Sequence, residues 1–264
     1  MKGCKMKSGN FLEETEYCNF SHPIVKGLAI EITKNCNTDR EKAVALFYWV
    51  RNNIQYTFGA WGIKASQVVL QKKGMCTNKA VLLTTLLRAC NIPAGFGMLK
   101  VDAKEYFGPI IPPMFKDFLG KNSVHFYSYV CLDNKWIKID SSVDPNLSEK
   151  THYFNPTTQL TEWDGYLDAT ENLDESHIKS EHGPWANIND LLKKKPKNAK
   201  KIVTFSGNIY LFFLRQTEIK IQDTDRELES LFKKWLRKNN FLFYCIMMLF
   251  AKYKNWEIKR TKKN

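Results

Sequence analysis

The chain has 264 residues, of which 44% are hydrophobic, and this is enough for one large or two small domains with an apolar core. The formal net charge of +13 belongs entirely to residues 191–264, which contain 19 Lys or Arg and 6 Asp or Glu, whereas residues 1–190 contain 21 of each. The seven cysteines are irregularly spaced and include no Cys-x-x-Cys pair, which argues against a disulfide scaffold and against a zinc site. The odd cysteine count, and first twenty residues that do not read as a secretory signal, predict reduced thiols in a cytoplasmic protein.

Two helices are expected near the N-terminus. Pro23 follows Ser21-His22 at a predicted helix start, and this helix extends to about Lys34. Thr38-Asp39-Arg40-Glu41 is a capping box, which predicts a second helix that continues through Val50. A short strand is expected over residues 54–58.

Cys76 lies at the start of the most apolar predicted helix. Gly74 interrupts the preceding element, the apolar pattern extends from Thr77 to Cys90, and Asn91-Ile92-Pro93 ends it. A helix N-terminus presents free backbone N–H groups and the positive end of the helix dipole, and both favour an anion. We therefore predict that Cys76 is a thiolate nucleophile. The alternative is an inert buried cysteine, which is our expectation for the other six.

Residues 91–123 are expected to contain one core strand and one irregular segment. The strand is predicted over Phe96–Val101. The segment from Asp102 to Asn122 is rich in glycine and proline, including Gly108-Pro109 and Pro112-Pro113. It is either a lid over a cleft or an ordinary surface loop, and the sequence favours neither.

A β-hairpin is predicted next. The segment Val124–Leu132 is β-branched and aromatic, Asp133-Asn134 suits a two-residue turn, and Trp136–Asp140 resumes as a strand. With this turn Leu132 pairs with Lys135, so that the numbers of paired residues add up to 267. The helices followed by this antiparallel sheet indicate an α+β fold.

The hairpin register brings His125 and Asp140 together. Asp140 lies opposite Tyr127, diagonal to His125 and on the same face of the sheet. Diagonal neighbours lie about 7–8 Å apart at Cα, within reach of a carboxylate and an imidazole. We therefore predict that His125 is a general base and that Asp140 orients it. The alternative is a buried structural histidine and a turn aspartate.

These residues, in the order Cys, His, Asp, resemble the transglutaminase-like superfamily, the microbial cysteine peptidases and acyltransferases related to animal transglutaminases. The resemblance covers roughly residues 20–145 and rests on three segments: Gly74-Met75-Cys76-Thr77-Asn78-Lys79-Ala80, Leu86-Leu87-Arg88-Ala89-Cys90-Asn91-Ile92-Pro93-Ala94 and Trp136-Ile137-Lys138-Ile139-Asp140. Two positions depart from the family pattern, since Phe126 replaces a frequent tryptophan and Gly95 a frequent arginine.

The resemblance implies a papain/transglutaminase-like core in which N-terminal helices, including the nucleophile helix, pack on an antiparallel sheet. It implies a triad of Cys76 as nucleophile, His125 as base and Asp140 as acid, acting on peptide or protein amide substrates through a thioester. Hydrolysis is the first expectation, amine-accepting transglutamination or amide synthesis the second, and a non-catalytic interaction module the third. The oxyanion hole would use the N–H of Cys76 and a second donor, for which Trp61 and Gln67 are candidates.

No cofactor and no metal are expected, because neither a phosphate-binding glycine loop nor an EF-hand calcium loop is found in the sequence. We assign residues 1–190 to the catalytic domain and residues 191–264 to a basic C-terminal extension.

The extension admits three interpretations. Thr224-Asp225-Arg226-Glu227 is a capping box before an amphipathic helix, and ten apolar residues follow at 241–250, too few to span a bilayer. This apolar run packs on the enzyme as a core helix, or residues 193–260 bind an anionic membrane surface. Nucleic-acid binding is least favoured, since no recognised motif accompanies the basic run at Lys193-Lys194-Lys195-Pro196-Lys197.

Overall fold

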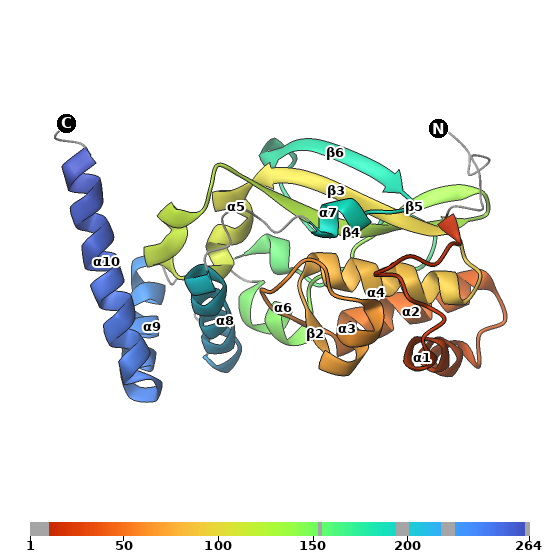
Figure 1. Ribbon diagram of the computed structural model, residues 1–264, viewed down its shortest axis with the longest axis horizontal. Helices are drawn as coiled ribbons and strands as arrows, with labels where there is room; N and C mark the ends of the chain where they lie inside the picture. Colours follow the sequence, from red (N-terminus) through yellow and green to blue (C-terminus); the bar gives the residue numbers. More distant parts are fainter. Residues whose placement is uncertain (1–10, 153–154, 194–200, 218–224, 262–264) are drawn as a thin grey trace.

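The computed structural model describes residues 11–152, 155–193, 201–217 and 225–261 (Figure 1). The α-helices are α1 (Pro23–Thr33), α2 (Asp39–Asn53), α3 (Ala65–Gln71), α4 (Cys76–Ala89), α5 (Ala103–Phe107), α6 (Pro145–Thr151), α7 (Asn189–Lys193), α8 (Lys201–Gln216), α9 (Asp225–Asn239) and α10 (Phe241–Thr261). Short 3-10 helices are η2 (Gly108–Ile110), η3 (Pro113–Phe118), η4 (Pro156–Thr158) and η5 (Glu175–His177). The strands are β1 (Gln55–Tyr56), β2 (Lys73–Gly74), β3 (Ala94–Asp102), β4 (Asn122–Leu132), β5 (Lys135–Ile139) and β6 (Ile178–Trp185).

The core is a helix layer under an antiparallel sheet, which confirms the predicted α+β class. The sheet has the strand order β5-β4-β3-β6, and a separate pair, β1 and β2, is parallel. Helix α4 packs against β3 and β4, and α1, α2 and α3 surround it on the side away from the sheet (Figure 1). Every residue of α4 from Cys76 to Arg88 is buried, because this helix lies between the sheet and the helices α1, α2 and α3.

Both predicted N-terminal helices are confirmed. Thr38 accepts a hydrogen bond from the backbone N–H of Glu41, and the Glu41 carboxylate accepts from Asn37 N, so the side chains satisfy N–H groups at the start of α2. In α1, His22 caps the helix by accepting from Ile24 N.

The hairpin formed by β4 and β5 has the predicted register. Leu132 pairs with Lys135 and Ser128 with Ile139. Asp133 and Asn134 have φ of +48° and +60°, and this left-handed conformation at both positions is typical of a two-residue turn whose twist matches the strands. The register places Asp140 directly after the last residue of β5.

The segment from Ala103 to Phe118 is not a solvated surface loop. It folds into α5, η2 and η3 and buries Phe107, Ile110, Ile111 and Phe115. These side chains belong to the same apolar cluster as Cys76. The segment therefore covers the start of α4, as the lid alternative requires.

The described part of the C-terminal extension packs on the rest of the protein. In α8, the guanidinium of Arg215 donates to the Asp144 carboxylate at 2.7 Å and to the carbonyl of Tyr56 at 2.9 Å. Phe243 and Met247 of α10 are buried, so one side of the 241–250 run packs as the core-helix alternative expects. Thr224 of the expected capping box and residues 194–197 of the basic run lie outside the described residues.

One expectation about the cysteines is wrong. Cys18, Cys36, Cys76, Cys90 and Cys245 are free thiols, but Cys131 is disulfide-bonded. The prediction of reduced thiols therefore does not hold for Cys131.

Candidate active site

Cys76 is the first residue of α4. Met75 precedes it in extended conformation, and its backbone N–H donates to the side chain of Asn78 at 3.0 Å. Asn78 in turn donates to the carbonyl of Trp61 at 2.8 Å. A Cβ at Gly74 would lie 2.7 Å from the Cβ of Asn78, so only glycine allows this close approach. The turn thus fixes the thiol at the helix start, where the sequence predicted it.

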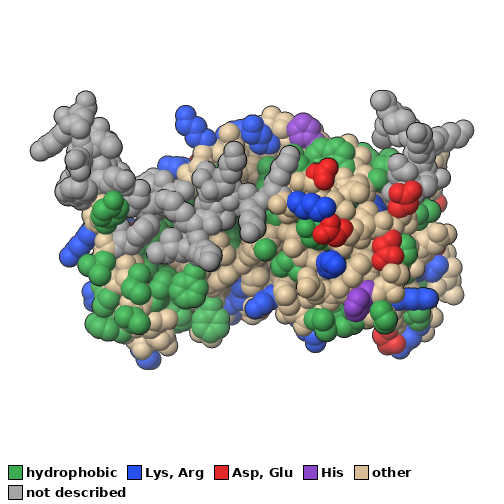
Figure 2. Space-filling model, in the orientation of Figure 1, with side chains coloured by type: hydrophobic (Ala, Val, Ile, Leu, Met, Phe, Trp, Pro, Cys, Tyr) green, Lys and Arg blue, Asp and Glu red, His purple; other side chains and the backbone are tan. Residues whose placement is uncertain are grey.

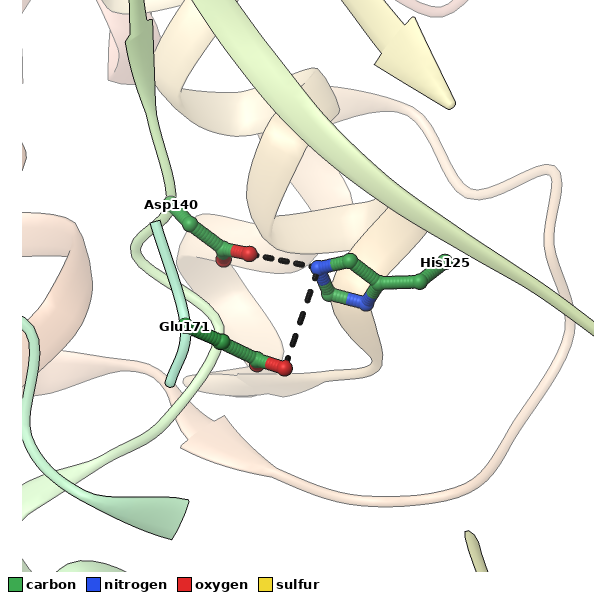
Figure 3. Close-up of side chains that lie close together, drawn as sticks. All are labelled: His125, Asp140 and Glu171. Carbon is green, nitrogen blue, oxygen red and sulfur yellow. Dashed lines mark hydrogen bonds and ion pairs between the residues drawn. The ribbon is translucent and has the colours of Figure 1, made fainter. Parts of the chain in front are cut away.

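His125 and Asp140 form a buried pair. The imidazole Nε2 lies 2.5 Å from Oδ2 of Asp140, and both side chains are almost fully buried, with 1% and 2% exposed (Figure 3). The second oxygen of Asp140 accepts from the backbone N–H of Ser142 at 2.9 Å. Asp140 is therefore held in place by its own loop and faces one nitrogen of His125.

The structure brings all three predicted site residues together. Cys76, at the start of α4, is among the groups that raise the pKa of the His125 imidazole, after Glu171 and Asp140. Cys76 is 1% exposed and belongs to an apolar cluster with Tyr56, Tyr106 and Phe107. Thiol, imidazole and carboxylate thus form one cluster shielded from water.

Two further residues of the site were not predicted. The hydroxyl of Tyr106 lies 2.6 Å from Nδ1 of His125 and 2.5 Å from Oε2 of Glu171. The same Glu171 oxygen lies 4.0 Å from Nε2 of His125, so two carboxylates approach this one ring nitrogen (Figure 3). Glu171 reaches the site because Ala169 pairs with Ile139 in a single parallel bridge.

The two carboxylates favour the protonated imidazole. Burial opposes protonation of His125, but the charges of Glu171 and Asp140 outweigh it, and the pKa of His125 is raised well above its ordinary value. Burial likewise opposes the charge on Asp140, yet the imidazole charge and hydrogen bond outweigh it and lower the pKa of that carboxyl. Burial raises the pKa of Glu171 to about 7. The site is built to hold an imidazolium, the partner that a thiolate needs.

A cavity of about 400 Å³ adjoins this cluster. Its lining combines His125, Asp140 and Glu171 with the carboxylates of Glu175 and Glu181. Lys138 also lines the cavity and pairs with Glu181 at 2.7 Å, so Glu175 is the carboxylate of the lining that is left to face a bound cation beside the triad.

The ligand atoms of His125, Asp140 and Glu171 lie within 4.8 Å of one another, close enough to be considered as a metal site. Two ligand atoms of a tetrahedral zinc, each about 2.0–2.2 Å from the ion, are more than about 3 Å apart. The 2.5 Å between Nε2 of His125 and Oδ2 of Asp140 is too short for two ligands of one ion and is a direct hydrogen-bond contact. The cluster is therefore better described as a hydrogen-bonded triad than as a metal centre.

The second oxyanion donor stays a prediction for both candidates, and Trp61 packs against the apolar cluster that contains Cys76. The side-chain oxygen of Gln67 accepts from Lys64 N at 3.4 Å and so caps α3. The ring of Trp61 packs on Phe126, with 5.9 Å between centroids. The backbone N–H of Cys76, the first proposed donor, lies at the start of α4.

Replacing Glu171 with Gln is expected to lower the pKa of His125, because the substitution removes a carboxylate charge that stabilises the imidazolium while keeping a partner for Tyr106. NMR titration of the histidine ring protons measures this directly, without a substrate. Glu175→Gln is the matched control, since it removes a carboxylate from the same cavity without a contact to the ring. An unchanged titration of His125 in Glu171→Gln would contradict this electrostatic assignment.

Comparison with known proteins found one matching family model and similar solved structures. A family model described as the transglutaminase-like superfamily matches residues 26–141. No curated protein matches the chain. A solved structure of a candidate cysteine protease from Cytophaga hutchinsonii is 19% identical with a TM-score of 0.40, over 65% of this chain and 53% of that one. A candidate protease from Parabacteroides distasonis is 15% identical with a TM-score of 0.33, over 44% of this chain and 23% of that one. The chain thus spans about half of the first of these structures and about a quarter of the second.

Proposed function

We propose that the chain is a thiol-dependent acyl-transfer enzyme, because a family model of the transglutaminase-like superfamily matches residues 26–141. Its substrate class is the amide bond of a peptide or protein, and its main reaction is hydrolysis. The observation that carries the proposal is the buried pair of His125 and Asp140, together with Cys76 at the start of α4, which is among the groups that raise the pKa of the same imidazole.

In the proposed reaction the Cys76 thiolate attacks the amide carbonyl, and the N–H of Cys76 stabilises the oxyanion. His125 then gives a proton to the leaving amine, and a thioester with Cys76 remains. Since Nε2 of His125 is bound to Asp140, Nδ1 is the nitrogen that transfers the proton. Water attacks the thioester with His125 as its base, the acid product leaves, and the thiol is regenerated.

Access to the thiol requires a movement. The Tyr106 hydroxyl occupies Nδ1 of His125, and Tyr106 and Phe107 lie in the cluster that buries Cys76. Both belong to α5, within the segment Ala103–Phe118. We infer that an acyl donor reaches Cys76 when this segment shifts, and that its return excludes water from the acylation step.

Water and an amine compete for the same thioester. Hydrolysis needs only water, which enters any opened site, so the triad by itself suffices for it. The alternative, transfer to an amine, is favoured by one observation, the cavity beside His125, because an ammonium group would be attracted to Glu171 and Glu175. Glu181 in the same lining is already paired with Lys138 at 2.7 Å. A non-catalytic interaction module is less well supported, since it needs no buried thiol, imidazole and carboxylate in contact.

The test measures how the thioester partitions. The enzyme is incubated with p-nitrophenyl acetate as acyl donor and rising concentrations of cadaverine, and acetate is quantified against acetylated amine. A hydrolase is expected to release mainly acetate even at millimolar amine. Saturable conversion to the amide would contradict the hydrolytic assignment and support the amine-accepting alternative. A Cys76→Ala protein run in parallel corrects for spontaneous aminolysis.

A further inference from the structure

Exposed large hydrophobic side chains are concentrated at the C-terminal end of the protein. Among the described residues, eight of the twelve that are exposed lie between residues 205 and 253. We call them the C-terminal apolar face: Phe205, Phe212, Leu231, Phe241, Leu242, Ile246, Leu249 and Tyr253. Scattered exposed hydrophobics need no explanation, but a contiguous apolar patch marks an interaction site.

Helix α10 shows that this exposure is not a by-product of packing. Phe243 and Met247 are buried at 5% and 0% exposure, so one side of the helix already serves the core. On another side, Leu242, Ile246, Leu249 and Tyr253 recur at helical spacing and are 43–73% exposed. Apolar side chains therefore cover more of the surface of α10 than the part that packs in the core.

Helices α8 and α9 extend the face. A groove of about 510 Å³ lies between them, lined by Phe205, Ile209, Phe212 and Trp235. Phe212 contacts Trp235 at 6.0 Å between ring centroids, so the aromatic surface continues from one helix to the next. Figure 2 shows hydrophobic side chains gathered at this end of the molecule.

The surroundings of the face are basic. Arg226, Lys234, Arg237 and Lys238 of α9 and Lys252 of α10 are exposed. In Figure 2 blue side chains border the apolar patch, whereas the red acidic side chains in that view lie toward the other end. Residues 191–264 carry the whole net charge of +13. None of the helices in the described part of the chain is both long and apolar enough to cross a bilayer.

We propose that the C-terminal apolar face binds an anionic membrane surface, with its apolar side chains in the upper acyl region and its lysines and arginines among the headgroups. Apolar insertion combined with attraction to anionic lipid is what peripheral membrane helices use. A second copy of this chain would bring an equally basic surface against the face and be repelled, and a nucleic acid would leave the apolar side chains without a partner. The enzyme would thereby act on substrates at the membrane.

Vesicle sedimentation tests the proposal. The full-length protein is mixed with vesicles of phosphatidylcholine alone, or of phosphatidylcholine with 30% phosphatidylserine, at rising NaCl concentration. Binding is expected to the anionic vesicles, to be much weaker to the neutral ones, and to fall as salt rises. The double variant Leu242→Ser/Leu249→Ser is expected to lose at least about tenfold in affinity, because two side chains of about 70% exposure no longer insert.

Leu70→Ser provides the matched control, since Leu70 in α3 is 67% exposed and Leu249 is 68% exposed. This control variant is expected to bind as the unmodified protein does. All the altered side chains are exposed, so unchanged circular dichroism is expected in each variant. Equal sedimentation of the double variant and Leu70→Ser, or no binding to anionic vesicles, would overturn the proposal. So would a dimer in analytical ultracentrifugation that the double variant abolishes, because the face would then be an interface between copies. None of these outcomes depends on whether the triad is catalytic.

Discussion

Cys76→Ala is expected to abolish turnover of p-nitrophenyl acetate, with a loss of about 10⁴-fold or more. The nucleophile is removed, and neither His125 nor Asp140 can replace it, because both only move or stabilise a proton in the proposed reaction. The side chain is small and lies at a helix start, so the folded protein should tolerate alanine there. The rate of p-nitrophenolate release and the thermal unfolding midpoint are measured together.

Cys18→Ala is the matched control, because Cys18 and Cys76 are each 1% exposed. It should keep full activity, since Cys18 is remote from the imidazole in sequence and is not among the groups that affect the pKa of His125. Limiting iodoacetamide, mapped by mass spectrometry, should modify Cys76 before the other free cysteines in spite of its burial, as the covering segment opens. Faster modification of Cys90, which is more exposed, or residual turnover in Cys76→Ala, would contradict the assignment of Cys76 as the nucleophile.

The predicted part of the site depends on short-range patterns. A glycine before an apolar helical run places Cys76 at a helix start, and a two-residue turn fixes the register that brings Asp140 to His125. These relations follow from 3.6-residue and two-residue periodicity, which a single sequence displays directly. The fold class followed from the same elements.

The unpredicted part depends on long-range packing. Tyr106 comes from a segment whose glycines and prolines were compatible with a lid or with a loop, and Glu171 from a stretch without periodicity. Their meeting at His125 requires the single bridge between Ile139 and Ala169, and nothing in the residues around Glu171 indicates it. In the same way, the ion pair of Arg215 with Asp144 joins α8 to the catalytic half through two positions that local patterns do not relate.

Through the Tyr106 hydroxyl, the protonation state of Glu171 affects the hydrogen bonding at Nδ1 of His125, the nitrogen proposed to transfer the proton. A phenol has one hydrogen to donate, and two acceptors, Glu171 and Nδ1 of His125, lie within 2.6 Å of its oxygen. When Glu171 is ionised, the hydroxyl donates to it and can accept from a protonated Nδ1. When Glu171 is protonated, the hydroxyl is free to donate to an unprotonated Nδ1. Because burial raises the pKa of Glu171 to about 7, ionisation above that pH favours the imidazolium beside Cys76.

His125→Ala and Asp140→Asn are expected to differ in severity, since the two residues have different roles. His125→Ala removes the only group that carries the proton to and from the substrate, and such general acid–base contributions amount to about 10²–10⁴-fold. Asp140→Asn keeps a hydrogen-bond acceptor for Nε2–H and loses only the charge that stabilises the imidazolium. Its loss of kcat/KM should therefore be smaller than that of His125→Ala, and its basic limb in a pH profile should move to lower pH, because the pKa of His125 falls when the carboxylate charge is removed.

Asp144→Asn separates this electrostatic role from a structural one. Asp144 is buried like Asp140, at 4% against 2% exposed, but its carboxylate caps α6 at Leu147 and binds Arg215 of α8. The same chemical change at Asp144 should therefore lower the thermal midpoint and leave kcat/KM of the folded enzyme and its pH profile nearly unchanged. Asp140→Asn should show the opposite pattern. If both variants lose stability equally and neither shifts the pH profile, or if His125→Ala is as mild as Asp140→Asn, then the buried pair supports the fold and the proton transfer must be assigned elsewhere.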